Sequence, residues 1–396
     1  MATAPRLKQN FRVLWFGSMI TDLGNAMTLP FIALYIQTLG DFTTSQLNLL
    51  GALAFGITYG CKALVAPLWG RLADQKGRKL MCLRASGMMT LTILGVGLAP
   101  NVTILLILRA LQGIFSGYIN NANALISLAA PPASRGRLLS RLVTGAITGS
   151  LLGPLLGSLL ARTVGYRGAF IVTSALMGLV FLSTWWGVHE EVHPVQRTAL
   201  APLGPVLKQL GPQFLLTLFS SLFVIQATTN AVTPLLSLLM AQIETDPGQV
   251  VMMTGLVAAA PGVATILLAG RVGRLIDRWG AERCLVGFFT LAVVDLAVTS
   301  LTRTVPQLVV ARFFLGIADA ALLPSLQVMT VSHVPRATFG RVFSLNQSAQ
   351  AMGNVLGPGM AVVVANTLGY QPIFLITAGL EALVLLGWVG YFRGRH

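Results

Sequence analysis

Twelve apolar runs, each of about 20 residues, follow one another along a chain of 396 residues. A helix of this length crosses a hydrocarbon core of roughly 30 Å and satisfies its own backbone hydrogen bonds there. Only 10% of the residues are charged, against roughly 25% in a soluble domain, so most of the surface is not suited to water. We predict an all-α, multi-pass membrane protein with twelve spans near residues 12–36, 46–69, 80–99, 102–128, 138–161, 166–188, 212–238, 248–270, 283–301, 305–330, 340–365 and 370–392.

The Lys and Arg residues gather in alternate loops. If both termini lie in the cytoplasm, 21 of the 27 fall in cytoplasmic segments, three in outer loops and three within spans. This asymmetry indicates a multi-pass protein of the bacterial cytoplasmic (inner or plasma) membrane with both termini inside. The net charge of +15 then follows from topology and from attraction to an anionic inner leaflet, so no nucleic-acid partner is expected.

The chain repeats itself at an offset of 203 or 204 residues. The stretch 70–77 is echoed by 273–280, Arg109 by Arg312, and Gly153 by Gly357. A near-constant offset at many positions indicates that the two halves have the same fold in the same orientation.

The halves are separated by a polar stretch that contains several prolines. We predict an N-terminal bundle of six helices in residues 1–188, a cytoplasmic linker in 189–211 and a second six-helix bundle in 212–396. Two such bundles are related by a pseudo-twofold axis along the membrane normal, with a binding site between them near the midplane.

Three motifs lie in the first half. The first is a charged loop motif with Gly70, Arg71, Asp74, Gly77 and Arg78. The second, in residues 105–117, has Arg109, Gln112 and Gly113, and the third has Gly149, Gly153, Pro154 and Gly157. They resemble the loop, fourth-span and fifth-span signatures of the major facilitator superfamily, and the whole chain resembles its twelve-span drug:proton antiporters. The resemblance implies the major facilitator fold, drug export by alternating access, and a proton as coupling ion with no metal or other cofactor; we also expect a monomer.

Span four carries a polar face on an otherwise apolar helix. Its members recur at helical spacing: Arg109, Gln112, Gly113, Ser116, Asn120 and Asn123. A charge at the bilayer centre costs roughly 2.5 to 3.5 kcal/mol, so Arg109 must face water, an acid or backbone carbonyls inside the bundle. It either locks helices together or takes part in proton coupling, and we favour coupling.

Several acids also lie within spans. Asp22, with Asn25 one turn further on, is our preferred proton carrier. Asp319 lies two turns beyond Arg312 and is either that arginine's structural partner or an alternative carrier; neither acid being the carrier is the third possibility. Of the remaining ionisable residues, we interpret Asp295 and Glu381 as buried helix contacts or cavity edges, and Lys62 as a snorkelling cation.

Amide side chains recur at helical spacing in the spans expected to line a central cavity. The candidate cavity residues are Asn25, Gln112, Asn120, Asn123, Gln226, Asn230, Asn346 and Gln350. Apolar walls with a few amides and an acid suit amphipathic or cationic drugs, although such rows also serve as contacts between helices.

Two further features have open alternatives. The glycines of span five, Gly145, Gly149, Gly153 and Gly157, step by four residues beside Pro154 and form either an exporter hinge or a tight packing seam. The resemblance implies that Gly70, Arg71, Asp74, Gly77 and Arg78 form a cytoplasmic latch in the outward-facing state, and the alternative is a topology signal only.

Other classes of protein lack support. The chain has no phosphate-binding loop ending in Gly-Lys-Ser/Thr and no Gly-x-Ser-x-Gly, and its four histidines fall in loops or at the end. We therefore predict neither an ATP-driven pump nor an enzyme, and a channel would not require the repeated motifs. The alternative to an exporter is a proton-coupled importer of a small nutrient on the same fold, because fold does not fix direction or substrate.

Overall fold

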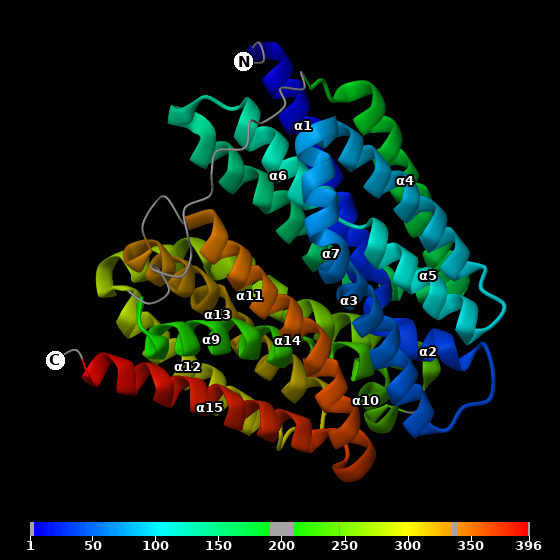
Figure 1. Ribbon diagram of the computed structural model, residues 1–396. Coiled ribbons are helices and arrows are strands. Elements are labelled where there is room, and N and C mark those ends of the chain that lie inside the picture. The colour runs from blue at the N-terminus through cyan, green and yellow to red at the C-terminus, as the bar shows by residue number, and fades with distance from the viewer. Residues whose placement is uncertain (1–3, 191–209, 245, 335–338, 395–396) are drawn as a thin grey trace. The chain divides into compact units, whose positions relative to one another are not determined.

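The computed structural model describes residues 4–190, 210–244, 246–334 and 339–394, and these residues form helices and no strand (Figure 1). The helices and 3-10 turns are α1 (Ala4–Thr28), η1 (Leu29–Phe31), α2 (Ile32–Gln37), α3 (Thr44–Lys76), α4 (Arg78–Gly97), α5 (Val102–Phe115), α6 (Tyr118–Ala129), α7 (Pro132–Gly187), α9 (Pro212–Ala231), η2 (Thr233–Leu235), α10 (Leu236–Ile243), α11 (Pro247–Trp279), α12 (Ala281–Thr299), α13 (Val305–His333), α14 (Phe339–Leu368) and α15 (Gln371–Arg393). Most of the predicted linker lies outside the described residues.

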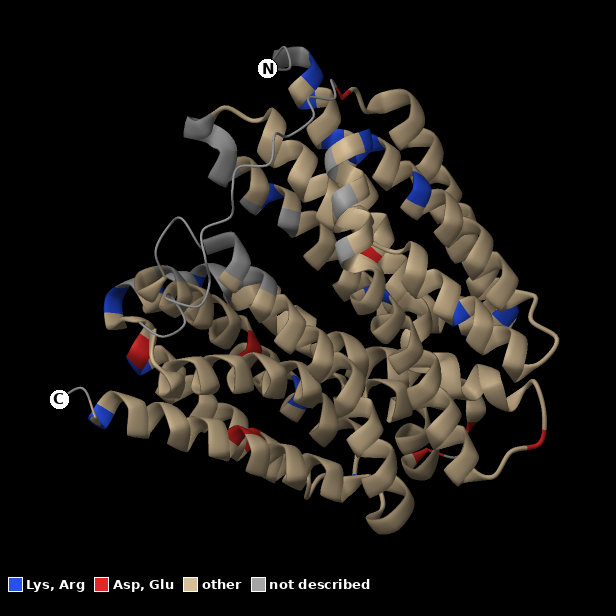
Figure 2. Cartoon of the chain, viewed as in Figure 1, with Lys and Arg blue, Asp and Glu red and all other residues tan. Residues whose placement is uncertain are grey.

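The chain divides into two compact units. The first comprises residues 1–43, 53–196 and 246–259, and the second comprises 44–52, 197–245 and 260–396. Two long helices, α3 and α11, therefore each contribute residues to both units. Lys, Arg, Asp and Glu are sparse along the helices of either unit (Figure 2).

Within the described residues, ten helical segments are long and apolar enough to cross a membrane. One of them, Thr144–Gly187, has 44 residues and turns at Gly165, where φ is 74°. A straight helix of that length would measure about 66 Å, twice the hydrocarbon core, so this segment provides the length of two crossings. α12 is not among the ten because its 19 residues include three charged side chains. The total of twelve crossings remains a prediction.

The internal repeat is visible in how the helices start and break. Pro30 in η1 and Pro234 in η2 interrupt the first helix of each half at the same offset of 204 residues. Asn101 caps α5 by accepting a hydrogen bond from the Ile104 N–H (3.0 Å), and Thr304, 203 residues later, caps α13 in a capping box with Gln307. The same local signals therefore set the same helix boundaries twice.

One break occurs in the first half only. α5 and α6 are separated at Gly117, where φ is 122°, a conformation that a residue with a Cβ rarely adopts. The Arg84 guanidinium donates to the carbonyl oxygens of Phe115 (3.4 Å) and Ser116 (3.0 Å) at this break and lies 3.6 Å from the Trp69 ring centroid. The repeat has Ala320 in place of Gly117 and Gly287 in place of Arg84, and α13 runs through this position without interruption.

Glycines bring pairs of helices into backbone contact. The span-five glycines of α7 face four carbonyl groups of α1 that also step by four residues: Gly145 faces Trp15, Gly149 faces Met19, Gly153 faces Leu23, and Gly157 faces Met27. The second half repeats this register, since Gly353 and Gly357 of α14 face the Phe223 and Ala227 carbonyls of α9. The row is thus a close-packed seam in this structure, while its role as a hinge stays a prediction.

Candidate functional site

In the first unit, three helices bring charged side chains together. Asp22 of α1 interacts with the Asn25 side chain and with the charge of Lys62 on α3. The Lys62 ammonium lies 5.8 Å from the centroid of the Tyr59 ring, and Tyr59 in turn interacts electrostatically with Asp22 and Arg109. Lys62, interpreted from the sequence as a snorkelling cation, is therefore a neighbour of the preferred proton carrier.

Arg109 of α5 is buried inside this unit. Its Nη1 donates to Oε1 of Gln112 (3.0 Å), whereas Nε and Nη2 are buried without a hydrogen-bond partner among the described residues. Gly113, on the same helix face, packs against the Thr58 carbonyl of α3, and the Thr58 hydroxyl donates to the Arg109 carbonyl (3.1 Å). A buried guanidinium with unused donors is available to an anion or to a proton-bearing group that approaches it.

The second unit holds a counterpart with more acids. Thr229 of α9 donates to Oδ2 of Asp319 on α13 (3.2 Å), and buried Arg312 interacts electrostatically with Asp319 and Asp295. Glu381 of α15 is buried and interacts with Asp319. One guanidinium thus faces two carboxyl groups, and a third acid interacts with Asp319, so a neutral interior requires protons or another cation.

The predicted cavity residues differ in their hydrogen bonds and in their burial. Asn230 donates to Oδ1 of Asn354 (2.8 Å) and to Oε1 of Gln226 (3.3 Å), and Asn346 donates to the Thr330 hydroxyl (3.3 Å). These amides connect helices within the second unit. Of the other candidates, Gln112 is buried against Arg109, Asn25, Asn123 and Gln350 are half-buried, and Asn120 is exposed.

The charged loop motif is mostly helical. α3 continues through Lys76 and α4 begins at Arg78, so the connection is Gly77 alone, with φ 92°. The sequence expectation of a loop over 70–80 is therefore wrong, because the residues before Gly77 extend the helix and only this glycine adopts a positive φ. The side chains of Arg71 and Asp74 lie outside the described part, and Gly70 faces open space.

The N-terminus of α4 is capped by an acid that the sequence analysis did not select. Glu190 accepts hydrogen bonds from the backbone N–H of Arg78 at Oε1 (2.8 Å) and of Lys79 at Oε2 (2.6 Å). Beside it, Asn10 and His189 exchange two hydrogen bonds of 2.7 and 2.8 Å. The chain leaving α7 is thus fastened to α1 and α4. The only sequence signal was an acid following the sixth apolar run.

Apolar helices long enough to span a bilayer, an internal repeat, and charges buried in each half define a multi-pass membrane transporter rather than an enzyme. A family model described as Major Facilitator Superfamily matches residues 14–243 and 218–396. The chain belongs to this superfamily, as the sequence motifs predicted.

Similar proteins extend over almost the whole chain. "Multidrug resistance protein MdtG" of Salmonella dublin is 39% identical over 374 residues, which cover 94% of this chain and 93% of the relative. The protein of the same name from Salmonella typhimurium is 38% identical with the same coverage.

Solved structures show the same fold at low identity. The nucleoside transporter NupG has a TM-score of 0.78 and 14% identity, with 97% of this chain and 99% of that chain covered. A bacterial homolog of the human lysosomal transporter Spinster has a TM-score of 0.77 and 14% identity, with 98% and 97% covered. At this identity the likeness establishes the fold alone.

Proposed function

We propose that this protein is a proton-driven multidrug antiporter that exports amphipathic or cationic drugs across the bacterial cytoplasmic membrane by alternating access. The observation that carries the proposal is the 39% identity, over 94% of the chain, to a multidrug resistance protein. The sequence asymmetry of Lys and Arg supports both termini in the cytoplasm, and we propose that the monomer is the working unit.

Asp22 is the proposed proton carrier. It lies within the first span, Lys62 and Tyr59 respond to its charge, and Tyr59 in turn interacts with Arg109. When Asp22 is ionised it offsets the cation on Lys62, and when it is protonated that cation loses its counter-charge. A cationic drug and a proton therefore compete for the same carboxylate, which couples their movements in opposite directions. Asp319, held by Thr229 and facing Arg312, remains the alternative carrier.

The driving force is adequate for export. Moving one charge through 100 mV supplies about 2.3 kcal/mol, which corresponds to a gradient of roughly 50-fold for a neutral drug. The close glycine seams between α1 and α7 and between α9 and α14 suit two bundles that each move as a rigid body.

The test is drug accumulation in cells that express the protein. Ethidium should accumulate to a lower level than in cells with an empty vector, and a protonophore should abolish the difference. Asp22→Asn should accumulate ethidium like the empty vector, whereas Asp41→Asn, which alters an exposed acid after the first span, should behave like wild type. A rise in accumulation on expression would instead favour an importer, and persistence of export with the protonophore would exclude proton coupling.

A further inference from the structure

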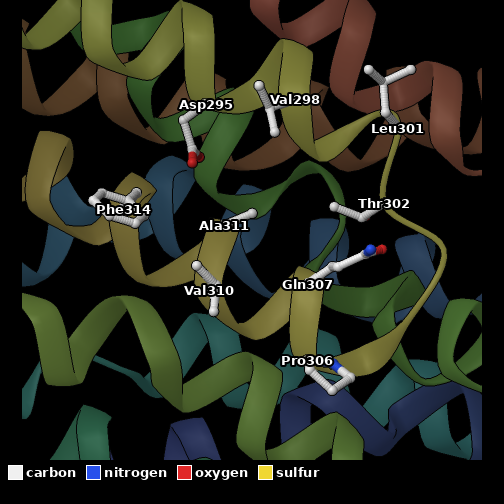
Figure 3. A pocket seen from close by; sticks show the side chains of 9 residues that line it. All are labelled: Asp295, Val298, Leu301, Thr302, Pro306, Gln307, Val310, Ala311 and Phe314. Atoms are coloured by element: carbon white, nitrogen blue, oxygen red, sulfur yellow. The ribbon is translucent and has the colours of Figure 1, made fainter.

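A groove of about 600 Å³ lies between α12 and α13 of the second unit (Figure 3). Its walls include four apolar side chains that are largely exposed: Val298 (54%), Leu301 (77%), Val310 (56%) and Phe314 (45%). On helices that cross a membrane, exposed apolar side chains are suited to lipid. The volume falls in the range of roughly 300 to 1,000 Å³ that is typical of sites for drug-sized molecules.

Asp295 of α12 stands at one end of this groove, one turn before the helix ends. Its side chain points into the space between the two helices (Figure 3), is only 8% exposed, and has Oδ2 buried without a hydrogen-bond partner among the described residues. An ionisable group in apolar surroundings is costly unless a partner satisfies it. The groove therefore presents an acid that lacks a complete set of partners.

The charges that face Asp295 do not supply that partner in full. Arg312 of α13 interacts with Asp295, but it also interacts with Asp319, and Glu381 interacts with Asp319 rather than with Asp295. One guanidinium serves these two carboxyl groups. An added monocation would complete the balance, whereas an added anion would increase the imbalance.

We propose that this groove is a binding site for lipophilic monocations, reached from the lipid, in addition to the transport site. The cationic centre of the ligand lies beside the Asp295 carboxylate, and its apolar body lies along Val298, Val310 and Phe314. The face of the Phe314 ring favours a positive centre as well. The assignment rests on the charges and walls of one unit and does not depend on the direction or energy source of transport.

Tetraphenylphosphonium and tetraphenylborate provide a matched pair of probes, because they have nearly the same shape and opposite charge. A reporter thiol is placed at the groove with Leu301→Cys, after Cys61, Cys82 and Cys284 are replaced by Ser, and its reaction with N-ethylmaleimide is timed in purified protein. We expect tetraphenylphosphonium to slow the reaction at least fivefold and tetraphenylborate to leave it unchanged.

Asp295→Asn should remove this protection, while Glu381→Gln, which neutralises a buried acid away from the groove, should retain it. If Asp295→Asn does not fold, Val310→Trp, which fills the groove and keeps the acid, should abolish protection instead. Equal protection by both probes, or protection that survives Asp295→Asn, would overturn the proposal. The reaction with N-ethylmaleimide is also timed without any probe in nanodiscs of phosphatidylethanolamine and of phosphatidylglycerol. A slower reaction in phosphatidylethanolamine would overturn the proposal too, because the occupant of the groove would then be a lipid ammonium group. Drug export measured in parallel separates failure of this site from failure of the proposed function.

Discussion

The glycine seam between α1 and α7 predicts that an alanine placed in the seam destabilises the protein, whereas an alanine placed at an unpacked helix position stabilises it. A Cβ added at Gly153 would lie 2.8 Å from the Leu23 carbonyl oxygen and 2.5 Å from the Ala26 Cβ. Favourable contacts between carbon atoms lie near 3.5 to 4.0 Å, so the two helices must separate by about 1 Å. A Cβ added at Gly379, in α15, would meet nothing within 4 Å.

Two opposing contributions set the magnitude of each change in the free energy of unfolding. Replacing a helical glycine by alanine stabilises the folded protein by about 0.5 to 1 kcal/mol where there is space for the added methyl group. Overpacking costs about 1 to 3 kcal/mol, so Gly153→Ala should destabilise by about 1 to 2 kcal/mol and Gly379→Ala should stabilise by up to about 1 kcal/mol.

Thermal unfolding of the purified variants in detergent measures this difference. At roughly 2 to 4 °C per kcal/mol, Gly153→Ala should lower Tm by about 2 to 8 °C and Gly379→Ala should raise it slightly. If Gly153→Ala matches wild type in Tm, the seam is not tight in the way described. If Tm is unchanged and export is lost, the glycine row acts as a hinge rather than as packing.

Three further predictions concern the charged groups. Arg109→Lys keeps the charge but loses the planar fork that reaches Gln112, so proton coupling should fall several-fold at normal membrane levels; wild-type coupling would reduce Arg109 to a generic charge. Glu190→Gln should lower the unfolding free energy by about 1 to 2 kcal/mol, because a neutral amide replaces the carboxylate that caps α4, and an unchanged Tm would contradict the cap. Asp74→Asn should slow turnover and shift the cytoplasmic inter-bundle distances, measured between spin labels, toward the inward-facing state, whereas Asp277→Asn should shift them less; identical distributions for wild type and Asp74→Asn would remove the latch.

The sequence predicted the helices well because their signals are local. Apolar runs, prolines at the same offset, and caps such as Asn101 and Thr304 act within a few residues, so each boundary is encoded where it occurs. The burial of Arg109 also followed from its place on the polar face of an apolar helix.

Contacts between distant residues could not be predicted in the same way. Arg84 is held over Trp69 at a helix break that only the positive φ of Gly117 permits, and nothing in its local sequence indicates this contact. Glu190 caps a helix that begins more than 100 residues earlier, and nothing in its local sequence names that partner. The pairing of Asp22 with Lys62 was missed for the same reason, since two helices must pack before the charges meet.

Proton coupling is tested most directly with purified protein in liposomes that contain a pH-sensitive dye and are loaded with drug at equal pH on both sides. Dilution into drug-free buffer drives the drug outward. An antiporter must then acidify the lumen, because a proton enters as each drug molecule leaves, and Asp22→Asn should abolish this signal while remaining folded. Acidification by Asp22→Asn at the wild-type rate would show that Asp22 is not the carrier, and alkalinisation by the wild type would show that drug and proton move together, contrary to the account.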